Sequence, residues 1–478
     1  MGEIDKATSR MTTGAIVFVS AISVFLYFEL MTQVWFLNIL NGYVIRVWIP
    51  PLALFLLVLV KKIRDKEKLF KPDFLNLLLL FYSLFGIISM LCNETLHNAI
   101  KYNLIMIAPV FYYIFIIEYF KNNDDIELIL RVLFFSSIFI CLHGIYLRVI
   151  ADISPISVTK SIATNYGTSV QLSEAFYSEM QNGKWVVSSR GLRSYEAGKL
   201  GAMMIAPILF GIFNYVKSSK KSRYFYLVGS FALIIFIFES MSRSGIIALC
   251  AGLIVFFILL YKNEKKQRKN IVVIGFVILV GAIFYSVFLK PQVMRRCLQL
   301  LNFLDIDIIN NYLEKYGMKN FGGGVSKTTF LDPHLKSIIA IPKHIMGDAA
   351  AAGGKFMFLM RLFLGSGYIT AEHVLREHNR YFFIILSAGI LTFIPYILFL
   401  FRLTFIIKKT TSEVVSKVSA GMNLGHFFFA CSIAFLLKLM NEGMETFYYW
   451  IIFSLASAWC YNISKQIKAE VATRQNSK

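Results

Sequence analysis

Charged residues are scarce in this chain, and their scarcity excludes several classes of protein at once. Only 16% of the 478 residues are Asp, Glu, Lys or Arg, whereas 57% are hydrophobic and 15% are aromatic. A disordered or collagen-like chain does not have this composition, and an ordinary soluble domain carries more charge. The six cysteines have no paired spacing, so they indicate neither a disulfide framework nor a metal site.

Long apolar runs take the place of the missing charge. They recur in stretches of about 17 to 22 residues, the length of a helix that crosses a bilayer. Hydrocarbon offers the backbone no hydrogen-bond partner, so each span must be helical. The predicted fold is therefore an all-α polytopic membrane protein, with a single domain over residues 1–478. The first run has no small-residue cleavage site behind it, so we expect a retained helix and not a signal peptide. We predict about twelve spans, near residues 13–31, 43–60, 74–92, 104–120, 127–147, 198–216, 224–240, 244–261, 270–289, 381–401, 424–440 and 447–464.

The positive charge is distributed unevenly between alternate connections. Cations crowd the connections at residues 61–71, 217–223, 262–269 and 402–417, whereas residues 32–42 and 439–446 contain no Lys or Arg. By the positive-inside rule the crowded connections are cytoplasmic, and both termini with them. Much of the net charge of +21 is therefore a topological signal.

Two long connections, residues 148–197 and 290–380, fall on the outer side and are also basic. Long translocated loops are not subject to the charge rule, so an anionic ligand is the simplest explanation for their cations. No basic helix or aromatic platform stands apart from the membrane, and we therefore expect no nucleic-acid partner. In the second loop, mixed apolar and polar segments with glycine hinges predict short amphipathic helices over the mouth of a cavity.

The most specific motif lies where the second long loop re-enters the membrane. His378-Asn379 is followed by nine residues and then by Gly389-Ile390-Leu391-Thr392. This string resembles the O-antigen ligase and polymerase superfamily, whose ligases carry His, then Asn, Ser or Gln, nine residues, Gly, two residues, and Gly, Thr or Tyr. The Gly365-Ser366-Gly367 turn upstream of the histidine also resembles that family.

Two arginine-bearing segments on the outer side resemble the same family. Ser242-Arg243-Ser244-Gly245 lies between two predicted spans, and Arg190-Gly191-Leu192-Arg193-Ser194-Tyr195-Glu196 ends the first long loop. Each also has a simpler interpretation, as an arginine that reaches lipid phosphates or as plain juxtamembrane charge. The resemblance fits either Arg190 or Arg193 as the first arginine. Other candidate cations of the second loop are Arg361, Arg376 and Arg380.

These residue types suit the transfer of a glycan from a polyprenyl pyrophosphate. The donor already has a good leaving group, so the reaction needs a base for the acceptor hydroxyl and cations for the pyrophosphate. Histidine suits the first task and arginine the second. The resemblance implies His378 as the catalytic base, with Arg190, Arg193 and Arg243 around the pyrophosphate. Asn379 and Arg376, beside the histidine, are further candidates for substrate binding.

The resemblance further implies an integral glycosyltransferase of GT-C-like fold in the inner membrane of a bacterium. Its donor would be a glycan on undecaprenyl pyrophosphate, and its acceptor either lipid A–core or a second lipid-linked glycan. The first acceptor makes the protein an O-antigen ligase and the second makes it an O-antigen or capsular polysaccharide polymerase. Both reactions use the same base and cations in contact with membrane lipid, and we expect inversion at the anomeric carbon with no cofactor and no metal.

Two other hypotheses remain open. Asp305 and Asp307 have the acid-x-acid form that can hold a metal on a nucleotide-sugar, although such donors are absent from the outer side. A polytopic transporter or lipid-linked oligosaccharide flippase would have broken spans and ionisable groups near mid-membrane. The strongest polar clusters here lie on one face, which favours chemistry at the surface over alternating access.

Overall fold

The computed structural model describes residues 43–66, 73–149, 176–181, 184–189, 197–218, 220–239, 243–285, 288, 354–368, 370–371, 379–417, 423–440 and 447–476. Within these ranges the chain is α-helical apart from one β-hairpin and one 3₁₀ turn, η2 (Lys265–Gln267). The α-helices are α2 (Tyr43–Arg64), α3 (Phe74–Asn93), α4 (Leu96–Tyr119), α5 (Asn123–Val149), α7 (Ala197–Lys217), α8 (Arg223–Glu239), α9 (Arg243–Asn263), α10 (Arg268–Phe284), α14 (Lys355–Leu364), α16 (Arg380–Lys417), α17 (Leu424–Leu439) and α18 (Phe447–Asn476).

Helices occupy eleven of the twelve predicted spans, and the first predicted span, residues 13–31, lies outside the described residues. Among the described residues, three segments are long and apolar enough to cross a membrane: Phe74–Asn93, Ser244–Asn263 and Arg380–Ser416. Shorter apolar helices occur at Met106–Tyr119, Gly201–Lys217, Arg223–Phe238 and Leu424–Leu439. The prediction of a helical membrane protein is supported to this extent, while the number of spans stays a prediction.

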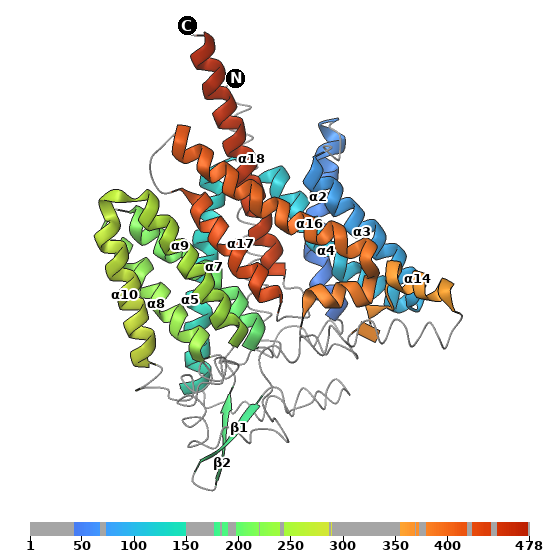
Figure 1. The fold of residues 1–478 in the computed structure, drawn as a ribbon, viewed down its shortest axis with the longest axis horizontal. Coiled ribbons are helices and arrows are strands. Elements are labelled where there is room, and N and C mark those ends of the chain that lie inside the picture. Colours follow the sequence, from blue (N-terminus) through green and yellow to red (C-terminus); the bar gives the residue numbers. More distant parts are fainter. Residues whose placement is uncertain are drawn as a thin grey trace.

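The hairpin is an addition to the predicted helices. Strands β1 (Phe176–Gln181) and β2 (Lys184–Ser189) pair antiparallel, with Phe176 opposite Ser189, inside the first of the two long loops. In Figure 1 the hairpin lies beyond one end of the helix bundle, and the last turns of α18 project from the opposite end.

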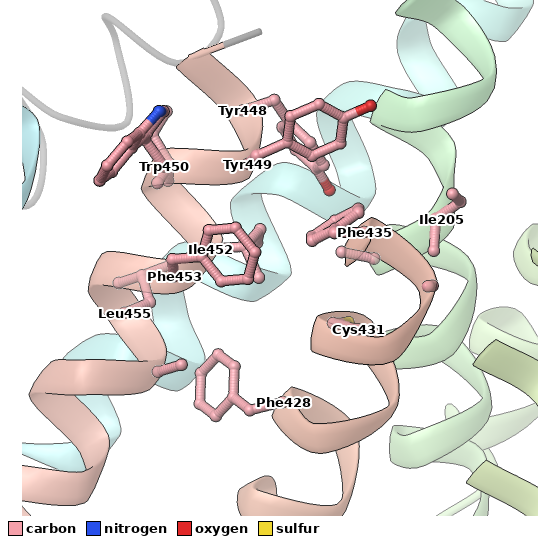
Figure 2. Packing of buried hydrophobic residues seen from close by; sticks show 14 of the residues in the cluster. Ile205, Phe428, Cys431, Phe435, Tyr448, Tyr449, Trp450, Ile452, Phe453 and Leu455 are labelled. Carbon is pink, nitrogen blue, oxygen red and sulfur yellow. The ribbon is translucent and has the colours of Figure 1, made fainter. Parts of the chain in front are cut away.

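Helix α17 lies near the centre of the bundle, where it packs against α7, α9, α16 and α18. Its Phe428, Cys431 and Phe435 point toward α18 in Figure 2. The Phe435 ring contacts the Tyr449 ring with 4.8 Å between centroids, and Trp450 turns to the other side of α18 to stack on Phe399 of α16 at 5.4 Å. Large aromatic side chains therefore fill the contacts of α18 with α17 and α16.

The described parts of the cation-rich connections gather at one end of the bundle, which we call the basic end. Ion pairs join α2 to α4 and α5 to α7 there. The carboxylate of Glu118 accepts from the ammonium groups of Lys62 at 2.8 Å and Lys61 at 3.2 Å, which ties α4 to α2. The carboxylate of Glu127 on α5 lies 2.9 Å from Lys217 at the end of α7. The clustering agrees with the alternation of basic and bare connections in the sequence.

The opposite end of the bundle, which we call the glycine end, holds α14 and the start of α16. α14 is a short helix in the second long loop, and it packs against α16 and α3. The loop helices predicted from the sequence, at segments such as residues 308–316 and 337–341, lie outside the described residues. Figure 1 places it at the same end of the bundle as the β-hairpin.

Candidate functional site

Helix α16 is broken inside the predicted motif. Gly389 has φ +76° and ψ 176°, so residues 380–388 and 390–417 are two helical segments joined at an extended glycine. The break leaves the carbonyls of Leu386 and Ser387 without their usual partners one turn further on. The backbone N–H of Ser366 donates to Leu386 O at 2.7 Å, and the N–H of Gly367 donates to Ser387 O at 3.1 Å. The Gly365–Gly367 turn and the Leu386–Gly389 break thus complete each other's hydrogen bonding, and we call this arrangement the glycine junction.

Only glycine fits at the two closest approaches of the junction. A Cβ on Gly389 would lie 2.1 Å from the carbonyl oxygen of Phe363, and a Cβ on Gly365 would lie 2.5 Å from the carbonyl carbon and oxygen of Ser387. Gly365 also has a positive φ of 78°. The positive φ and the lack of space both exclude a side chain at Gly365 and Gly389. The glycine of the turn and the glycine of the motif are therefore required by the same contact between the two segments.

Two polar side chains of α3 fasten the junction to the rest of the bundle. The Ser89 hydroxyl donates to the carbonyl of Leu364 and lies 3.3 Å from that of Ser387. The Asn93 amide donates to Leu364 O at 3.2 Å and to Ser89 O at 2.9 Å. Both residues lie at the end of a membrane-span candidate, so α3 fixes the height of the junction along the bundle.

Asn379 caps the start of α16. Its carboxamide oxygen accepts from the N–H of Phe382 at 3.1 Å, its own carbonyl accepts from the N–H of Phe383 at 2.9 Å, and its side chain is buried. Asparagine is among the best residues for this position because it satisfies a helix N–H that has no partner within the helix. The second residue of the motif therefore sets where α16 begins.

The last residue of the motif, Thr392, is fully buried. It lies one turn beyond the break and faces α3, because a Cβ on Gly86 would lie 3.8 Å from Thr392 Cγ2. Asn379 thus caps the start of α16, Gly389 breaks the helix, and Thr392 packs its first part against α3.

Two buried cations lie at the glycine end. Arg380 is 2% exposed and Lys438, on α17, is fully buried. The hydroxyl of Tyr381 donates to Leu436 O at 2.9 Å, so the start of α16 lies against the last turn of α17. Burying a cation in an apolar bundle is costly unless anionic or polar groups compensate it. The glycine end therefore places two cations of the described residues inside the bundle.

Arg380 is one of several candidate cations predicted from the sequence, whereas Lys438 is not among them. The signal was present, because Lys438 interrupts an apolar run of α17 with a charge inside a predicted span. Such a residue is rare in a membrane helix and usually faces the interior of the bundle or a polar site.

The remaining predicted site residues are less fully defined. Arg243 is the first residue of α9, at the α8–α9 connection. His378, Arg190, Arg193 and Arg376 lie outside the described residues, as do Asp305 and Asp307. The structure therefore tests neither the convergence of the arginines on the histidine nor the metal alternative. Among the described residues, no group of three or more His, Cys, Asp or Glu is placed to hold a metal ion.

No protein-family model matches the chain, and no curated protein matches it in sequence.

Proposed function

We propose that this protein is a membrane glycosyltransferase that moves a glycan from undecaprenyl pyrophosphate to an acceptor hydroxyl. The observation that carries the proposal is the motif from His378 to Thr392, together with the geometry of its described part. Asn379, Gly389 and Thr392 have separate roles at the start of α16, and the Gly365–Gly367 turn packs directly against the break. A chance match to a sequence pattern does not require its members to share one structural unit.

The reaction is a single displacement at the anomeric carbon. His378 accepts the proton of the acceptor hydroxyl while the acceptor oxygen forms a bond to the anomeric carbon. The bond from that carbon to the pyrophosphate oxygen breaks, and undecaprenyl pyrophosphate leaves with the electron pair. Attack from the face opposite the leaving group inverts the anomeric centre.

Cations of the chain hold the pyrophosphate as negative charge develops on it. We assign this role to Arg243 and to Arg190 or Arg193, with Arg376 and Asn379 near the base. The chain needs no metal ion in this scheme, because guanidinium groups supply the charge and the planar donors for phosphate oxygens.

The two acceptors divide the proposal into two candidate enzymes. The histidine motif favours the ligase, which transfers a finished glycan to lipid A–core. The polymerase, which transfers to a second lipid-linked glycan, shares the same base and cations. In either case we propose the inner membrane of a bacterium as the location, with twelve spans, both termini in the cytoplasm and the glycine end on the outer side.

Deletion of the gene, followed by analysis of the cell's glycolipids, tests the proposal. A ligase predicts that polymer is still made but stays on its carrier, and a polymerase predicts lipid A–core that bears a single repeat. Restoration by the wild-type chain and by His373→Ala, but not by His378→Ala at the same protein level, assigns the effect to the motif. An unchanged set of glycolipids in the deletion strain would contradict both candidates.

A further inference from the structure

Helix α14 is an apolar helix that, among the described residues, has no matching apolar partner on one side. Apart from Lys355 and Arg361, all of its ten residues are apolar, yet none of them is fully buried. Phe356, Leu359 and Phe363 are 69%, 46% and 42% exposed. Their spacing of three and four residues places them on one side of the helix. The side chains form a continuous exposed stripe, which we call the α14 stripe.

The position of α14 relative to the membrane follows from its hydrogen bonds to α3. The carbonyl of Leu364, the last residue of α14, accepts from Ser89 and from Asn93. These residues lie in the last two turns of Phe74–Asn93, which is long and apolar enough to cross a membrane. The end of α14 therefore lies at the height where that span reaches the bilayer surface.

Helix α14 is too short to cross the bilayer itself. Ten residues make a helix of about 15 Å, half of a hydrocarbon core of about 30 Å. Exposed apolar side chains of α3 continue to the same height, since Ile88 and Leu91 are exposed on its last turns. The α14 stripe thus extends an apolar surface that already faces lipid if α3 spans the membrane.

We propose that α14 lies in the interface of the bilayer at the glycine end, with the α14 stripe inserted among phospholipid acyl chains. A helix of this composition gains free energy by burying its apolar side at the boundary between headgroups and acyl chains. The cationic ends of Lys355 and Arg361 reach the headgroup phosphates. In this position α14 anchors the second long loop at the membrane surface and holds the glycine junction in place. The inference depends on the membrane and not on the proposed reaction.

Cysteine accessibility in lipid nanodiscs tests the proposal, with full-length protein carrying one added cysteine. Leu359→Cys probes the α14 stripe, Leu84→Cys on α3 is the lipid-facing reference, and Thr95→Cys, exposed just beyond α3, is the water-facing reference. Peptide mass spectrometry measures the rate of modification at each site by a charged maleimide. We expect Leu359→Cys to react at least tenfold more slowly than Thr95→Cys and within twofold of Leu84→Cys.

Quenching by brominated acyl chains identifies what covers the stripe. An environment-sensitive fluorophore on Leu359→Cys should be quenched as strongly as one on Leu84→Cys. Reaction as fast as that of Thr95→Cys would overturn the proposal. So would protection without quenching, or oxidation of Leu359→Cys to a disulfide-linked dimer, because another part of the chain or a second copy would then cover the stripe.

Discussion

The basic end joins its helices through charge, whereas the glycine end joins them through backbone hydrogen bonds. At the basic end, one carboxylate on α4 is surrounded by the ammonium groups of Lys61, Lys62 and Lys121. At the glycine end, two peptide N–H groups of a turn complete a broken helix, and the contact is close enough to exclude any Cβ. The first arrangement tolerates small shifts of the backbone and the second does not. Precise placement is what a catalytic histidine requires, so we propose a structural role for the basic end and a chemical role for the glycine end.

The largest loss of stability should come from Gly389→Ala. The new methyl group would need the space of the Phe363 carbonyl, and the left-handed φ adds strain of its own. We expect a loss of about 4 kcal/mol of stability, seen as a collapse in the yield of monodisperse protein in detergent.

Gly354→Ala is the matched control for this substitution. Gly354 has the same φ of +76°, but nothing lies within 4 Å of its would-be Cβ. The Gly354→Ala variant should lose only about 1 kcal/mol of stability, which is the cost of the backbone conformation. Equal losses of stability in the two variants would show that close packing at the glycine junction contributes nothing to stability.

The second largest effect should come from Glu118→Gln at the basic end. The side chain of Glu118 is 11% exposed and that of Lys62 is 4% exposed, so the substitution leaves a buried ammonium group without its counter-charge. Breaking a buried pair in this way costs about 3 kcal/mol, measured as a fall in the unfolding temperature in detergent.

Asp65→Asn provides the control, since the same chemical change is made in an exposed pair with Arg64 at 2.9 Å. That hydrogen bond lowers the pKa of Asp65, but water screens the pair on both sides. The unfolding temperature should not change. A fall as large as that of Glu118→Gln would mean that burial does not set the strength of the pairs at this end.

A smaller effect should come from Asn379→Ala, which removes the cap of α16. The loss should be about 1 kcal/mol, and Asn379→Asp should restore it because aspartate caps equally well. Asn423 caps α17 at the basic end, where its side chain accepts from the N–H of Gly425 at 2.9 Å, and Asn423→Ala should cost a similar amount.

The two caps separate stability from function. If the glycine end carries the chemistry, glycan transfer should fall severalfold in Asn379→Ala and stay near the wild-type rate in Asn423→Ala, at equal protein levels. Equal transfer by the two variants would remove the functional distinction between the ends.

No effect is expected from removing divalent metal ions. Chelation with EDTA should leave the rate of transfer by purified protein unchanged, since cations of the chain neutralise the pyrophosphate in our proposal. A loss of activity that returns with one specific metal would instead direct attention to Asp305 and Asp307.

Hydropathy predicted the positions of the helices well, because bilayer-length apolar runs have few alternatives to a helix. It predicted their ends less well. α16 runs on to Lys417 and α18 to Asn476, beyond the predicted ends at 401 and 464, because a helix does not have to end where its predicted membrane span ends. In α18 the added residues include Lys, Gln, Ala and Glu, which have good helix propensity.

The break in α16 could not be predicted from hydropathy, since residues 381–401 form one hydrophobic segment without a charged residue. Its cause is non-local: the carbonyl of Phe363 and the N–H groups of Ser366 and Gly367 define the geometry at Gly389. The only local signal was the glycine of the motif. The buried cation at Lys438 was likewise visible in the sequence, but its proximity to the start of α16 required the structure.

Glycan transfer by purified protein tests the central claim most directly. Wild type, His378→Ala and His373→Ala would each be reconstituted in nanodiscs with a carrier-linked glycan and a lipid A–core acceptor, and the product followed by mass spectrometry. We predict that wild type and His373→Ala form the glycosylated acceptor, whereas His378→Ala forms at least a hundredfold less. Transfer by His378→Ala at the wild-type rate, in equally folded protein, would contradict the assignment of chemistry to the glycine end.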